Sequence, residues 1–282
     1  MVASVSVEAA EVPAAAAAAV CQPAAVALCV SASASVLVAH TASGCFPMRE
    51  FATLALGYAA CEAEAVAFPF VVRACTDFAV CASETAVRQQ LRLEPEVRGY
   101  RDDGGYTEHV VTTGIAALAS FDDQTLRHNV IDSECHRPAS LMPAALAATP
   151  GADAVRASLR LAYVLSPVPA TRGAFGDLHQ DPPMGSGWQY LSRGRKRWHC
   201  VDDTAVEGRA PAFSRHQCRQ VATPPDMGAV ARTARVLTAE IAAGDFLSFP
   251  MSWPHAVATL EASLGLRGYG AVPTPRVGAG NA

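Results

Sequence analysis

The fold is decided by the stretch Trp188-Gln189-Tyr190-Leu191-Ser192-Arg193-Gly194-Arg195-Lys196-Arg197-Trp198. Apolar and aromatic residues on both sides of the central Arg-Gly-Arg predict a strand, a tight turn and a second strand. Side chains two positions apart on a strand point to the same face. The second strand therefore presents Lys196, Trp198 and Cys200 on one face and His199 on the other.

Several other short strands are expected around this pair. Residues 159–165 alternate between large apolar and other side chains, which predicts a strand with one buried face. Further strands are predicted at 68–73, 177–181, 236–241, 246–249, 253–259 and 264–270, with turns at 243–245 and 260–262. Many short strands separated by turns predict a mainly β protein with peripheral helices, built as a sandwich or a barrel such as a cupin-like jelly roll.

The remaining segments suggest how the chain is divided. Residues 1–48 are rich in Ala, Val and Ser, with Glu8 and Glu11 as their only charges, and are expected to be low-complexity and poorly ordered. Prolines interrupt this stretch and no basic residue precedes it, so a membrane anchor is not favoured. The domain is expected over 49–270, with its core at 159–270 and a loose tail at 271–282.

Smaller features are also expected within the domain. Residues 83–92 form a helix in this prediction, with Ser83 as its N-cap. Residues 100–150 are expected to be loops and helices, and 202–235 to be an insertion.

Composition narrows the function classes. The formal net charge is −4, so bulk charge does not favour non-specific nucleic-acid binding. Nine scattered cysteines without a C-x-x-C pair indicate reduced thiols and an intracellular protein, in the nucleus or the cytoplasm, rather than a disulfide framework or a structural zinc site. Lys196 is the only lysine among 22 basic residues, which suggests that an ammonium is specifically needed there.

A metal site is the main chemical candidate. His179 and Asp181 are two apart on a predicted strand, so an imidazole and a carboxylate point to one face. His255, in Phe249-Pro250-Met251-Ser252-Trp253-Pro254-His255, is the best third ligand. Two histidines and a carboxylate leave three octahedral positions open, which suits non-haem Fe(II). The alternative for H-x-D alone is a surface histidine near an aspartate.

If Lys196 faces this metal, it is the natural partner for a dicarboxylate bound there. A buried ammonium is costly without a partner, and the carboxylate of a ligand would supply one.

The segment from His179 to Trp198 resembles the jumonji-C oxygenases, in particular their small protein-hydroxylase-like branch. That family follows H-x-D with a G-x-K-R-W turn, a G-D-x-x-x-x-P segment, a tryptophan and the second histidine. This chain has Gly194-Arg195-Lys196-Arg197-Trp198, then Gly244-Asp245-Phe246-Leu247-Ser248-Phe249-Pro250, and then Trp253 and His255, in that order. The resemblance covers about 159–270, is faint over 66–92, and does not extend to 1–48.

The resemblance implies a double-stranded β-helix and assigns roles to individual residues. His179, Asp181 and His255 are the implied catalytic ligands of Fe(II), and Lys196 binds the distal carboxylate of the cosubstrate 2-oxoglutarate. Gln189 stands where relatives often carry an Asn near the cosubstrate. Trp188 and Trp198 are expected to pack the barrel.

Two positions depart from the family pattern: Gly176 stands where relatives often carry Ser or Thr, and Arg267 stands where relatives of this branch often carry Thr. Related oxygenases outside the jumonji branch hold the distal carboxylate with an Arg on the last strand. Arg267 is therefore a second candidate for that contact, alongside or instead of Lys196. Few residues follow the last strand, which favours a monomer over the helix-mediated dimers of some relatives.

The implied activity is hydroxylation, or demethylation, of a protein side chain. Three alternatives remain open: an oxygenase of a modified RNA nucleoside, a jumonji-like binding module without catalysis, and a zinc or other cupin enzyme with the same three ligands.

Overall fold

The computed structural model describes residues 45–64, 66–102, 107–126, 129–131, 141, 160–166, 175–181, 186–202, 214–215, 220–221, 223–250 and 253–269. The expectations for 1–44 and for the tail at 271–282 lie outside the described residues. Residues 45–47, at the end of the segment expected to be low-complexity, form strand β1 (Cys45–Pro47), which pairs with β12.

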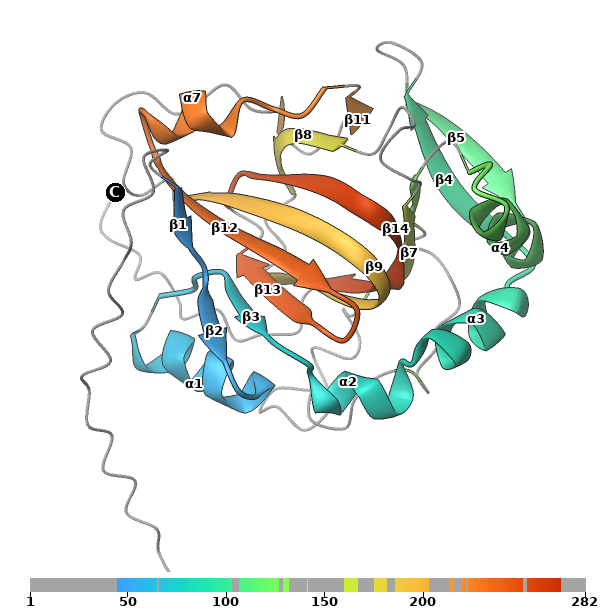
Figure 1. Ribbon diagram of the computed structural model, residues 1–282, viewed down its shortest axis with the longest axis horizontal. Coiled ribbons are helices and arrows are strands. Elements are labelled where there is room, and N and C mark those ends of the chain that lie inside the picture. The colour runs from blue at the N-terminus through green and yellow to red at the C-terminus, as the bar shows by residue number, and fades with distance from the viewer. Residues whose placement is uncertain are drawn as a thin grey trace, which may run out of the picture. The chain divides into compact units, whose positions relative to one another are not determined.

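Two sheet layers form the centre of the domain, and two long strands belong to both of them (Figure 1). The long strands are β9 (Ser186–Asp202) and β14 (His255–Tyr269). In the first layer, the N-terminal half of β9 pairs with the C-terminal half of β14. On its other side this half of β9 pairs with β13 (Phe246–Pro250), and this half of β14 pairs with β7 (Arg160–Ser166). In the second layer, the other halves of β9 and β14 again pair with each other. Here β9 also pairs with β12 (Arg235–Ala242), and β14 also pairs with β8 (Phe175–Gln180). This topology is the expected jelly roll of the cupin type.

The turns expected at 193–195 and 260–262 are bends within continuous strands, so the expectation of separate strands there is wrong. Gly194 has φ +84, and the register of β14 shifts between Thr259 and Leu264. The two bends touch, because a Cβ on Gly194 would lie 2.3 Å from the Ala262 carbonyl oxygen. Only a glycine combines this φ with so close an approach. The paired bends carry β9 and β14 from one layer to the other.

Further strands extend both layers. β3 (Phe70–Val72) and β2 (Arg49–Phe51) continue the first layer beyond β13. At its other edge it continues through β6 (Asn129–Ile131), β4 (Val97–Asp102) and β5 (Thr107–Thr112). The hairpin of β4 and β5 corrects the expectation of loops and helices in this region, where local polarity hid the pairing. β10 (Ser214–Arg215) and β11 (Gln220–Val221) pair with β8, inside the expected insertion.

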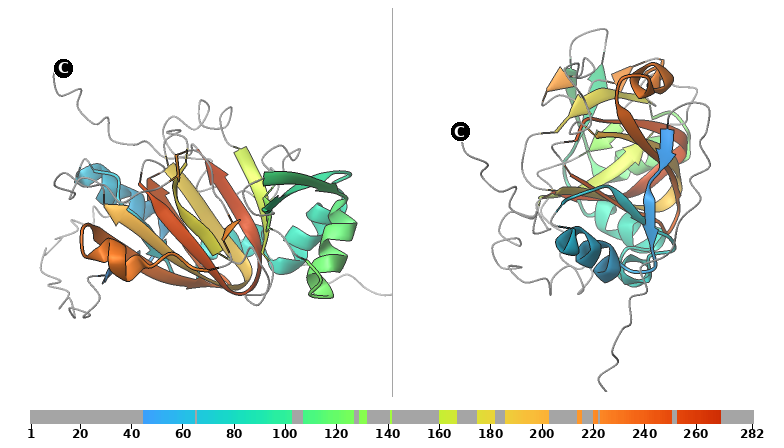
Figure 2. Two further views of the ribbon diagram at one scale, coloured as in Figure 1. Left: turned by 90° about the horizontal axis from the view of Figure 1, so that it is seen from above. Right: turned by 90° about the vertical axis from the view of Figure 1, so that its left-hand side faces the viewer.

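Helices cover the outer face of the first layer (Figure 2). They are α1 (Leu54–Ala63), α2 (Thr76–Cys81), α3 (Glu84–Arg92) and α4 (Gly114–Asp122). The N-cap expected for α3 is confirmed, since Ser83 Oγ accepts from the Ala86 amide. Phe78 of α2 stacks on Tyr190 and Phe246, and Trp188 joins the same core. Residues 163–166 of β7 are buried on both faces of the strand, because one face meets the helices and the other the barrel interior.

The barrel interior and the outer face of the second layer hold further buried clusters. Trp198 and Cys200 share one face inside the barrel, as the parity of the second half of β9 predicted, and Leu191 packs in the same cluster. Val201 lies on the other face, under α7 (Met227–Ala231).

The Gly244-Asp245 pair has a clear structural role. Gly244, with φ +93, turns the chain between β12 and β13, where a turn was expected. The Asp245 carboxylate accepts from the amides of Ala242 and Ala74, each at 3.0 Å, and from Arg73 at 2.7 Å. This carboxylate therefore ties the turn to the end of β3, which explains why an aspartate follows the glycine.

Cys45, Cys61, Cys75, Cys81 and Cys200, the cysteines within the described ranges, are free thiols. No helix in the described part of the chain is long and apolar enough to cross a membrane.

Candidate metal centre

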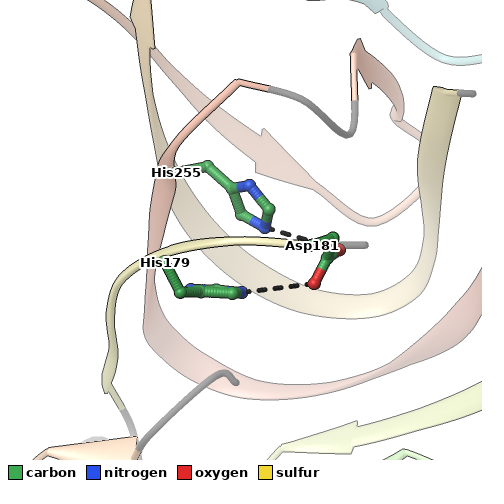
Figure 3. A group of neighbouring side chains, drawn as sticks. All are labelled: His179, Asp181 and His255. Carbon is green, nitrogen blue, oxygen red and sulfur yellow. Dashed lines mark ion pairs between the residues drawn. The ribbon is translucent and has the colours of Figure 1, made fainter. Parts of the chain in front are cut away.

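His179, Asp181 and His255 come together at one end of the barrel (Figure 3). His179 is near the end of β8, Asp181 directly follows that strand, and His255 begins β14. The two histidines are cross-strand partners. Each side chain offers one ligand atom, and these atoms lie within 4.8 Å of one another. The expected convergence is therefore present.

Backbone carbonyls orient both imidazoles. His179 Nδ1 lies 2.9 Å from the Asp177 carbonyl oxygen, and His255 Nδ1 lies 3.1 Å from that of Trp253. A carbonyl can only accept, so each Nδ1 carries the proton and each Nε2 is unprotonated, the form that can bind a metal. Both Nε2 atoms face Asp181, at 3.6 Å from Oδ1 and 3.8 Å from Oδ2 respectively. Fixing the tautomer in this way is how proteins prepare histidine for a metal.

The spacing fits one small ion. With bonds of roughly 2.0–2.2 Å, neighbouring ligands of one ion stand about 3–3.5 Å apart. The two histidine–carboxylate separations, 3.6 and 3.8 Å, exceed this only slightly, and all three ligand atoms lie within 4.8 Å of one another, so side-chain rotations would bring them into bonding distance.

The protonation states also suit a metal at neutral pH. Burial, and then the neighbouring His179, lower the pKa of His255 to about 3, so the ring is neutral. Burial acts to raise the pKa of Asp181, but nearby positive charge, including the Arg267 guanidinium, outweighs it, and the net pKa lies below the usual value. A neutral imidazole and an ionised carboxylate are the forms that bind metal.

An aromatic wall backs the site. The Trp198 ring stacks on His255 with centroids 5.5 Å apart, and Phe249 lies 4.7 Å from the same imidazole. These rings hold His255 in place and keep water away from one side of the site.

Lys196 is buried inside the barrel, on the face that parity predicted. Its Nζ donates to Ser166 Oγ at 2.6 Å. Thr259, its cross-strand partner on β14, is also buried. Two polar residues, Ser166 and Thr259, therefore neighbour Lys196, and Thr259 lies four residues along β14 from His255.

Gln189 and Arg267 form another cross-strand pair, in the first layer. Gln189 is buried, and the Arg267 side chain is 20% exposed. Arg267 Nη2 lies 3.4 Å from Asp181 Oδ2. Arg267 therefore reaches Asp181 of the candidate metal group, and Lys196 contacts Ser166 on β7.

Sequence patterns missed several of these partners. Ser166 was missed because it lies on the less apolar face of its strand, and the carbonyls of Asp177 and Trp253 cannot be inferred from residue types.

His199 was expected away from the metal, and it lies on the outer face of β9, where its Nδ1 has no hydrogen-bond partner within the described structure. Burial, and then Arg197, lower the pKa of His199 to about 4.

The fold and the site together define a cupin-type barrel with a buried His-Asp-His group able to hold a metal ion. No family model and no curated protein matches the sequence. Among solved structures, the X-ray structure of E. coli ycfD matches over 72% of this chain and 49% of that chain, with 16% sequence identity and a TM-score of 0.41. This chain thus spans about half the length of that protein.

Proposed function

We propose that this protein is an Fe(II)- and 2-oxoglutarate-dependent oxygenase that hydroxylates a protein side chain. The observation that carries the proposal is the buried group of His179, Asp181 and His255, with both Nε2 atoms directed at the carboxylate. Two histidines and one carboxylate with open positions are the ligand set of non-haem Fe(II) oxygenases. Together with 2-oxoglutarate and O₂, such an iron supplies C–H hydroxylation, with release of succinate and CO₂.

The barrel interior offers a suitable binding site for the distal carboxylate of a dicarboxylate ligand. We assign the distal carboxylate of 2-oxoglutarate to Lys196, with Ser166 and Thr259 as polar neighbours. A buried ammonium gains most from a carboxylate partner in such a lining. Gln189, buried on the neighbouring strand, is assigned to the side of the same cosubstrate.

A protein is favoured over RNA as the substrate because the local arginine cluster on β9 is neutralised. Arg193 pairs with Glu84 at 3.4 Å, Arg195 with Glu261 at 3.1 Å, and Arg197 with Glu240 at 2.5 Å. These ion pairs leave little net positive charge for phosphates, and the whole chain has a net charge of −4. Hydroxylation is proposed rather than demethylation, for which no described residue gives separate support.

The first experiment measures succinate formed from 2-oxoglutarate in the presence of Fe(II), ascorbate and O₂, with pools of peptides as substrate. Wild-type protein is expected to produce succinate, and His179→Ala is expected to produce none. His199→Ala is the matched control, since His199 lies on the opposite face of the same sheet and should leave turnover unchanged.

The other outcomes separate the competing functions. A protein that binds metal and 2-oxoglutarate without forming succinate is a binding module. Retention of zinc in place of iron, with no response to 2-oxoglutarate, indicates a different cupin enzyme. Succinate stimulated by modified RNA and not by peptides would replace the proposed substrate class.

A further inference from the structure

Arg267 lies beside the proposed metal ligands, on a strand at the centre of the first layer. It lies on β14, opposite Gln189 of β9 on one side and Ala162 of β7 on the other. A residue paired on both sides cannot shift along its strand without breaking two ladders. The guanidinium of Arg267 is therefore delivered to Asp181 by a rigid part of the barrel.

The contact involves one particular oxygen of Asp181. Arg267 Nη2 lies 3.4 Å from Oδ2, which His255 Nε2 faces at 3.8 Å, whereas His179 Nε2 lies 3.6 Å from Oδ1, the oxygen without the guanidinium contact. A hydrogen bond from a guanidinium occupies a lone pair of the oxygen that accepts it. Oδ1 is then the oxygen better able to bind a metal together with the two imidazoles.

The number of carboxylate oxygens on the metal matters for a cosubstrate. Two imidazoles and one oxygen use three of six octahedral positions. A carboxylate bound through both oxygens would use a fourth, leaving two positions where a chelating cosubstrate and O₂ together need three.

We propose that Arg267 is a positioning residue that restricts Asp181 to a single metal bond, through Oδ1, and so keeps three positions open. This inference rests on the metal site of the proposed function. It also gives a physical role to one of the two positions where the chain departs from the jumonji-C pattern, and it does not require Arg267 to hold the distal carboxylate.

A purely electrostatic role predicts a different result. A guanidinium next to a divalent ion repels it, so removal of the charge alone would tighten metal binding and leave the number of open positions unchanged. Counting the water ligands of the metal therefore distinguishes positioning from charge.

The test uses Mn(II) as the probe, with the full chain, and counts metal-bound water by the broadening of the Mn(II) resonance in ¹⁷O-enriched water. Wild type is expected to hold about three water molecules, following the open positions of a facial triad. Arg267→Met and the shorter, polar Arg267→Gln are each expected to hold about one fewer. Arg267→Lys, which keeps a long cationic donor, is expected to restore the wild-type count.

Arg193→Met serves as the matched control, since it removes another arginine of the first layer that pairs with a carboxylate at 3.4 Å, far along β9 from the triad. Its water count should equal that of wild type. Equal counts in wild type and in both Arg267→Met and Arg267→Gln would overturn the inference. If Arg267→Met does not fold, the Gln variant alone decides. Failure of wild type to bind Mn(II), or equal binding by His179→Ala, would instead refute the proposed metal site.

Discussion

His179 and His255 face each other as cross-strand partners of β8 and β14, with ring centroids 4.2 Å apart. Their separation in the chain is large, yet the register of a single strand pair brings them together. Asp181, two residues beyond His179, then lies on the same side. The candidate metal centre thus depends on one β-ladder more than on any local motif.

Loss of a ligand should strongly weaken metal binding without unfolding the barrel. Asp181→Asn keeps the shape of the side chain but removes its charge, and we expect affinity for Mn(II) to fall by at least about 100-fold, beyond the 10–100-fold typical of supporting residues. Isothermal titration calorimetry measures this directly. Glu261→Gln is the control, because it neutralises a carboxylate of β14 that pairs with Arg195 at 3.1 Å, six residues along the strand from His255. Unchanged affinity in Asp181→Asn would contradict the site.

Lys196→Met should weaken binding of the cosubstrate without affecting binding of the metal. The methionine fills the space of the lysine stem but has no ammonium, so we expect binding of 2-oxoglutarate to weaken by at least about 10-fold, the loss of one charge-assisted hydrogen bond. Mn(II) affinity should stay the same. 2-Oxobutyrate, which lacks the distal carboxylate, should bind wild type and Lys196→Met equally. A large difference between the two proteins in affinity for 2-oxobutyrate would show that Lys196 does not act by binding the distal carboxylate.

Asp245 should be a strong stability determinant. Its carboxylate is 10% exposed and accepts from two amides and from Arg73. Asp245→Ala leaves those donors unpaired, and we expect a loss of about 2–4 kcal/mol in the free energy of unfolding by urea. Arg73→Ala should cost less, because that side chain is 42% exposed. Similar costs for the two variants would mean that the ion pair, rather than the turn, carries the effect.

Gly194 should tolerate no side chain. Its φ of +84 disfavours other residues, and a Cβ would lie 2.3 Å from the Ala262 carbonyl oxygen. Gly194→Ala is expected to destabilise the protein by at least about 2 kcal/mol, as measured by thermal and urea unfolding. Gly244→Ala is the comparison, since it has a similar φ but its nearest contact is an ordinary 3.8 Å. If both variants lose the same stability, backbone strain alone explains the requirement for glycine at 194.

His199 should make the protein sensitive to acid. Burial, and then Arg197, lower its folded-state pKa to about 4, below the ordinary 6.5. The unfolded chain therefore takes up a proton at a higher pH than the folded one, and stability falls as the pH drops from 6.5 through 4. Between pH 7 and pH 5, wild type should lose about 1–2 kcal/mol more than His199→Gln in urea unfolding, after allowance for partial solvent screening. A parallel pH dependence in both proteins would contradict the prediction.

The sequence by itself determined the features that depend on local periodicity. Alternation on β9 predicted that Lys196 and Trp198 are buried on one face and that His199 lies on the other. The Ser83 cap and apolar spacing predicted α3, and H-x-D predicted two ligand groups on one side of a strand. Each of these needs only neighbouring residues and the geometry of one element.

Only the tertiary structure decided which distant residues meet. It made β9 and β14 continuous through touching bends, paired Lys196 with Ser166, and brought Arg267 to Asp181 across 86 positions. Such contacts depend on the register between strands, and a shift of one residue would turn every side chain to the other face. Register is set by the packing of the whole barrel, which local sequence patterns do not contain.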